Sequence, residues 1–132
     1  MGASERYRDF GLLVLRVGMG VMFIFHGWPL LSGGPAIWEK IGAATVYVGI
    51  KAFPIFWGFM AAFAQFFGGI ALILGLFFRP ACLLLVITMA VAATMHIGRG
   101  EGLKVASQAI EDGVVFLGLF FIGPGTYGFG KK

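Results

Sequence analysis

The composition of this 132-residue chain excludes an ordinary soluble domain, because 59% of its residues are hydrophobic and only 12% are charged, against about 25% charged in soluble proteins. Its mean hydropathy of +0.93 predicts one integral membrane domain over residues 1–132. The net charge of +4 is spread over the ends of the apolar segments, so nucleic acid is not expected as a partner. Cys82 is the only cysteine, which excludes an intramolecular disulfide, a CxxC redox pair and an iron–sulfur cluster held by this chain alone.

The first apolar run, residues 10–28, predicts a transmembrane helix, because about 20 mostly apolar residues cross a hydrocarbon layer of about 30 Å. Arg16 and His26 lie within this run. A charged side chain inside a bilayer costs roughly 3 kcal/mol without water or a partner, so both should face other helices. Two interpretations of Arg16 stay open. Its side chain either extends to the cytoplasmic surface or, on one face with Gly20, holds a polar headgroup or Gln65.

The connection after the first span contains an amphipathic stretch. Ile37, Trp38 and Ile41 fall on one helical face, and Glu39 and Lys40 fall on the other,. Such a pattern is typical of a helix that lies in the membrane interface with a tryptophan at headgroup depth. The sequence therefore predicts a short interfacial helix in the first loop.

Three further apolar runs predict spans over residues 54–78, 80–97 and 106–122,. In the second span, residues at spacings of three and four form a stripe that predicts a packing seam: Gly58, Ala61, Ala62, Gln65, Gly68 and Gly69. Gln65 is the only strongly polar side chain there, so it should point into the bundle. The chain is thus expected to be an all-α membrane protein, a four-transmembrane-helix bundle.

The distribution of lysine and arginine predicts the orientation of the bundle. One side carries five of these cations: Arg6, Arg8, Arg79, Lys131 and Lys132. The other side also carries several acidic residues, and its four cations are Lys40, Lys51, Arg99 and Lys104. We therefore expect a protein of the cell (inner) membrane with both termini in the cytoplasm.

Two histidines and one carboxylate are the candidates for chemistry. In this topology His26, His96 and Glu111 lie at a similar depth near the outer face. Such a set is able to bind a metal, relay protons or hydrogen-bond the carbonyls of a quinone, and ligation of a haem by both histidines is a further alternative. The competing interpretation is that both histidines lie at the wet interface and only bridge helices. Signatures of hydrolases, zinc proteases and phosphate-binding loops are absent from the sequence,.

Four stretches together resemble the DoxX family of small four-helix membrane proteins over nearly the whole chain: LRVGMGVMFIFHGWPLL, AQFFGGIALILGLFFRPACLLL, VAATMHIGRGEG and IEDGVVFLGLFFIGPGTYGFG. Members of that family are associated with respiratory-type redox chemistry, as a quinol oxidase subunit, as the related thiosulfate:quinone oxidoreductase and as membrane partners of oxidative-stress proteins. The resemblance implies a quinone-linked or redox-associated role, and the polar positions that match are Arg16, His26, Gln65, His96 and Glu111.

Two departures from the family pattern weaken a proton-coupled role. Gln65 stands where many relatives have a glutamate before the paired glycines, and a glutamine cannot carry a proton. Pro29 and Leu30 stand where relatives often have a lysine soon after His-Gly.

Three hypotheses for the function follow. The first is a redox-associated subunit that binds a quinone headgroup or a metal, with a partner or a bound haem supplying the redox centre. The second is a non-catalytic accessory or scaffold subunit. The third is a small-molecule carrier with Arg16 and Gln65 as a midplane site, which would need to be an oligomer. The expected partners are the lipid bilayer and either other membrane subunits or further copies of the chain.

Overall fold

The computed structural model describes residues 3–43, 49, 52–125 and 127, and in that part of the chain it contains helices and no strand. The helices are α1 (Ala3–Ser32), α2 (Pro35–Gly42), α3 (Pro54–Leu74), α4 (Phe78–Gly98) and α5 (Leu103–Ile122). All except α2 are long and apolar enough to cross a bilayer. The predicted bundle of four transmembrane helices, with a short helix in the first loop, is confirmed.

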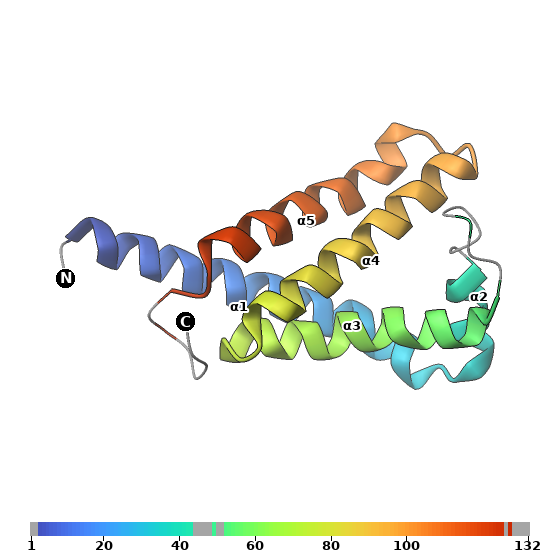
Figure 1. Ribbon diagram of the computed structural model, residues 1–132, viewed down its shortest axis with the longest axis horizontal. Coiled ribbons are helices and arrows are strands. Elements are labelled where there is room, and N and C mark those ends of the chain that lie inside the picture. Colours follow the sequence, from blue (N-terminus) through green and yellow to red (C-terminus); the bar gives the residue numbers. More distant parts are fainter. Residues whose placement is uncertain (1–2, 44–48, 50–51, 126, 128–132) are drawn as a thin grey trace.

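The long helices form two antiparallel pairs, α1 with α3 and α4 with α5. Figure 1 shows the pairs close together at one end and diverging toward the other, where α2 lies between α3 and α4. We call the first the terminal end, because α1 begins there and α3 and α5 end there. We call the second the loop end. In the described residues the backbones of α1 and α5 do not approach closely, and side chains such as Phe23 and Phe116, with ring centroids 4.9 Å apart, fill the space between them.

The helix boundaries differ from those predicted by hydropathy. α1 continues through Pro29 to Ser32, because a proline removes only one bond of the helical ladder and the helix resumes after it. α3 ends at Leu74 rather than at residue 78, since Gly75 adopts a left-handed conformation with φ 72° and its N–H bonds to the carbonyl of Ala71,. α4 then begins before Pro80, which the first turn of a helix tolerates,.

Glycines bring the helices into backbone contact. A Cβ atom added to Gly20 of α1 would lie 2.5 Å from the carbonyl oxygen of Gly69, and one added to Gly69 would lie 2.6 Å from that of Gly20. Gly58 of α3 is pressed in the same way against Trp38 of α2, and Gly68 faces Leu85 of α4. The predicted small-residue seam of α3 is therefore used by three different neighbours.

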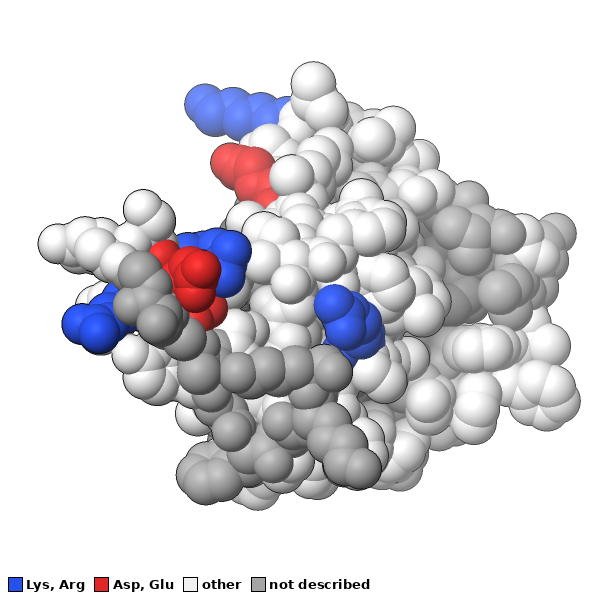
Figure 2. All heavy atoms as spheres, turned by 60° about the vertical axis from the view of Figure 1, so that its left-hand side comes forward, with Lys and Arg blue, Asp and Glu red and all other residues white. Residues whose placement is uncertain are grey.

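The outer surface of the bundle is suited to lipid. Large apolar side chains are exposed along the long helices, among them Val14, Phe25, Ile87, Leu117 and Phe121. On the face shown in Figure 2, lysine and arginine side chains are separated and form no basic patch among the described residues. Contact with a bilayer accounts for such a surface.

The lysine and arginine residues that the structure describes lie at the ends of the bundle to which the sequence analysis assigned them. Arg79 is in the first turn of α4 at the terminal end, and Lys40, Arg99 and Lys104 are at the loop end. Lys51, Lys131 and Lys132 of that count are outside the described residues. The cytoplasmic location of the terminal end stays a prediction.

Candidate functional site

Arg16 is buried at the terminal end, with 1% of its surface exposed. Its Nε donates to the carbonyl of Leu72 at 2.9 Å and its Nη2 to that of Ile73 at 3.0 Å. The last carbonyls of a helix have no partner within the helix, so the guanidinium caps α3 and its charge lies at the negative end of the helix dipole. Its Nη1 donates to the carbonyls of Pro124 and Tyr127, in the segment after α5.

This geometry bears on two of the contacts expected for Arg16, the cytoplasmic surface and Gln65. The side chain does not extend to a water surface, because it is buried. Gln65 is not among its hydrogen-bond partners. Along α3, Gln65 lies seven residues before Leu72, about 10 Å at 1.5 Å per residue. The structure therefore gives Arg16 a role in joining helix ends and does not bring it together with Gln65.

The two histidines have different acidic neighbours. His96, in the last turn of α4, lies with its Nδ1 3.2 Å from an oxygen of Glu101. His26, exposed on α1, lies near enough to Asp112 of α5 for the two to interact electrostatically. Glu111, beside Asp112, is exposed. In the described part of the chain no group of three or more histidine, cysteine, aspartate or glutamate side chains is placed to hold a metal ion, so His26, His96 and Glu111 are not assembled as the predicted ligand set.

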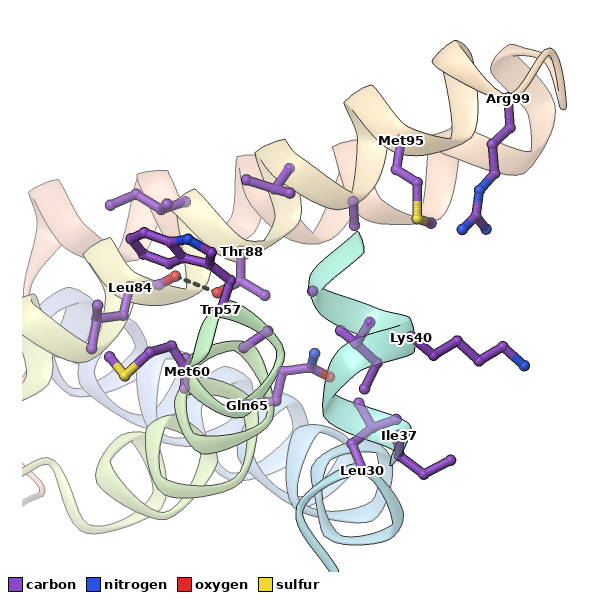
Figure 3. Close-up of a pocket in the computed structure, with 17 residues that line it drawn as sticks. Leu30, Ile37, Lys40, Trp57, Met60, Gln65, Leu84, Thr88, Met95 and Arg99 are labelled. Carbon is purple, nitrogen blue, oxygen red and sulfur yellow. Dashed lines mark hydrogen bonds between the residues drawn. The ribbon is translucent and has the colours of Figure 1, made fainter. Parts of the chain in front are cut away.

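A cavity of about 600 Å³ lies at the loop end between α2, α3 and α4. Figure 3 shows its wall, in which α3 and α4 face one another and α2 covers one side. The wall is mostly apolar, with Ile41, Met60, Leu84, Ile87, Val91 and Met95 among its residues. Its volume and apolar lining are those of a site for a small hydrophobic ligand. Ile87 is also 52% exposed on the outside of the bundle, so the wall reaches the lipid-facing surface.

Two polar groups of the wall have no partner in the described structure. Figure 3 shows the amide of Gln65 extending from α3 toward α2, and no hydrogen bond of this amide is found among the described residues. The indole Nε1 of Trp57 is buried and unpaired there as well, which costs about 1–3 kcal/mol. By contrast, the hydroxyl of Thr88 donates to the carbonyl of Leu84 at 2.8 Å. The amide of Gln65 is thus an unused hydrogen-bonding group on an apolar wall, whereas the nitrogen of Trp57 is enclosed by the protein.

Comparison with known proteins bears on this arrangement. A family model described as DoxX matches residues 11–97, more than half of the chain. The chain belongs to the DoxX family. Neither the curated proteins nor the solved structures compared with the chain gave a match. The matched segment of this DoxX protein extends from α1 to the last turn of α4 and includes nearly the whole cavity wall, whereas Glu111 and α5 follow it.

Of the five ligand-binding residues predicted from the sequence, the cavity of the DoxX protein is lined by Gln65 and by none of Arg16, His26, His96 and Glu111. Sequence reasoning missed Trp57, which resembles the other aromatic residues of α3 and is distinguished only by its unpaired indole nitrogen. It also missed Lys40 and Arg99, which line the cavity at the loop end and had been assigned only to topology.

Proposed function

We propose that this DoxX protein is a redox-associated membrane subunit that binds a quinone in the cavity between α2, α3 and α4. The observation that supports this is the unpaired amide of Gln65 on an otherwise apolar wall. A quinone has two carbonyl acceptors on an apolar ring and carries an apolar tail. One carbonyl would accept a hydrogen bond from the amide of Gln65, and the ring and tail would contact the aliphatic side chains.

The depth of Gln65 suits a lipid-soluble ligand. Gln65 lies eleven residues after the start of α3 at Pro54, about 17 Å along the helix, which is near the middle of a hydrocarbon layer of about 30 Å. A quinone reaches this level by diffusion within the bilayer, and the exposed side of the wall at Ile87 gives its tail an exit.

The role of each donor follows from its chemistry. The amide of Gln65 has no titratable proton near neutral pH, so Gln65 would orient a carbonyl of the ring rather than deliver protons. The indole of Trp57 donates only, but its nitrogen is enclosed by the protein, so we give it no contact with the ligand. A bound quinone would itself supply the electron-accepting chemistry, and the electron donor would be a partner subunit or a bound haem, the two sources named by the sequence hypothesis.

Quinone binding is tested by titrating the purified protein with a decyl-substituted benzoquinone in detergent and measuring Kd by calorimetry. We expect Gln65→Leu to raise Kd about tenfold, the equivalent of one lost hydrogen bond of about 1.4 kcal/mol. Thr88→Val is the matched control, because its hydroxyl lines the same cavity but is already bonded to Leu84. An unchanged Kd in Gln65→Leu, or an equal loss in Thr88→Val, would contradict the proposal.

A second candidate, the accessory subunit, is favoured by Glu111. This residue is exposed and lies eight residues after the start of α5, about 12 Å into the helix. A carboxylate that faces lipid at such a depth is costly, whereas a neighbouring subunit would shield it. The test is the mass of the protein–detergent complex extracted from its native membrane. If Glu111→Gln leaves that mass the same as wild type, docking through Glu111 is excluded.

A further inference from the structure

Two cations lie at the loop-end rim of the cavity. Lys40 comes from α2, and Arg99 is the residue that directly follows α4. Figure 3 shows Arg99 projecting from the end of α4 toward the side of the cavity covered by α2, and Lys40 extending outward from α2. Both side chains are exposed while their residues line the same apolar volume. The rim therefore joins a positively charged entrance to a hydrophobic interior.

The rim lies at the level of lipid headgroups. The 21 residues of α4 rise about 31 Å, the thickness of the hydrocarbon layer, so Arg99 follows the span at its boundary with water. Two tryptophans mark the same level. Trp28 is exposed near the end of α1, and the indole of Trp38 in α2 donates to the carbonyl of Leu30.

The charges of the rim are available to a ligand. Among the described residues neither Lys40 nor Arg99 forms an ion pair. The nearest acid along the chain from Arg99 is Glu101, which pairs with His96. Glu39 adjoins Lys40 in sequence, but successive residues of a helix do not face each other.

We infer that Lys40 and Arg99 bind the phosphate of an anionic phospholipid, one acyl chain of which occupies the cavity. Charge complementarity selects the phosphate, and the apolar wall selects the chain. From Leu84 to Arg99 the wall extends along α4 for about 22 Å, more than the roughly 15 Å depth of one leaflet's hydrocarbon. A free phosphate ion would bind only at the rim and leave the cavity empty. Occupation of the cavity by an acyl chain therefore distinguishes a bound lipid from bound phosphate.

A consequence for regulation rests on the proposed function. The acyl chain and a quinone would occupy the same volume, so anionic phospholipid would compete with quinone. The composition of the surrounding leaflet would then set how much of the site is open to quinone.

Native mass spectrometry of the full chain tests the lipid site, with dioleoyl phosphatidylglycerol as the anionic probe and dioleoyl phosphatidylcholine as the zwitterionic reference. We expect wild type to bind the anionic lipid more tightly than the zwitterionic one. In the double variant Lys40→Gln/Arg99→Gln the ratio of the two affinities should fall about 25-fold, about fivefold for each cation. Lys104→Gln is the matched control, because it removes an exposed cation from the same end that does not line the cavity. It should retain the preference.

Two further arms identify the ligand. Excess inorganic phosphate should leave the lipid bound, and Ala61→Phe, which fills the cavity from α3, should weaken the binding of both lipids. Displacement by phosphate, full binding in Ala61→Phe, or an unchanged preference in the double variant would each overturn the inference. The quinone Kd is measured separately in phosphatidylcholine, where the double variant should have the same Kd as wild type. This measurement distinguishes loss of the lipid site from loss of the quinone site.

Discussion

The two ends of the bundle treat buried polar groups in opposite ways. At the terminal end, the guanidinium of Arg16 donates to four backbone carbonyls, two of them at the end of α3. At the loop end, the indole of Trp57 and the amide of Gln65 have no partner in the described structure. A saturated polar group stabilises the fold, while an unsatisfied one beside a cavity costs stability until a ligand pairs with it. The contrast separates a structural arginine from a candidate binding site within one small protein.

The largest effect is expected at the saturated end. Arg16→Met removes a charge and takes away the donor that pairs the carbonyls of Leu72 and Ile73 at the end of α3. We expect a loss of at least about 3 kcal/mol in the free energy of unfolding, measured by denaturant titration in mixed micelles. Arg16→Lys should recover part of it, because an ammonium has fewer donors and a different geometry. A variant as stable as wild type would show that the carbonyl contacts do not stabilise the fold.

A smaller effect is expected at the contact between Gly20 and Gly69, where α1 packs against α3. Gly20→Ala places a methyl group against the backbone of Gly69. We expect this overpacking to lower the free energy of unfolding by about 1–3 kcal/mol. Gly18→Ala is the matched control, because nothing lies within 4 Å of an added Cβ there. It should gain up to about 1 kcal/mol from helix propensity. Equal thermal stabilities of the two variants would show that α1 and α3 are not in close contact.

The smallest effect carries the opposite sign. Trp57→Phe removes the buried unpaired N–H, so we expect the unliganded protein to keep its stability or gain up to about 1 kcal/mol, since the lost ring area offsets part of the relief. The quinone Kd should stay close to that of wild type, because the indole nitrogen is enclosed by the protein. Thermal unfolding with and without the benzoquinone measures both the stability and the binding. Destabilisation as large as that of Arg16→Met would remove the distinction between the two ends.

The fold was largely predictable, because its main determinants are local. Hydropathy located the four spans, and the spacing of Gly58, Gly68 and Gly69 revealed the seam of α3. The ends of the helices were less accessible. Whether a chain turns at Gly75 or continues past Pro29 depends on backbone conformation and on neighbours that a hydropathy window does not contain.

The candidate site was predictable only in part. The small-residue stripe indicated that Gln65 faces the interior, which the cavity wall confirms. The cavity itself arises because α4 diverges from α3 and α2 covers the opening, an arrangement with no sequence signature. His26 and His96 were placed at one depth by topology, but depth does not determine the direction in which a side chain points, and the two have different acidic neighbours.

The hydrogen-bond acceptors of Arg16 are synthesised at different times. A ribosome produces Arg16 early, α3 much later, and the segment with Pro124 and Tyr127 only after α5,. Until that segment arrives, the guanidinium lies among apolar helices with half of its acceptors missing. A product that stops at the end of α5 would contain the four described spans and still carry an incompletely paired charge. Cellular quality control would therefore have a physical basis for telling such a product from one that includes Pro124 and Tyr127.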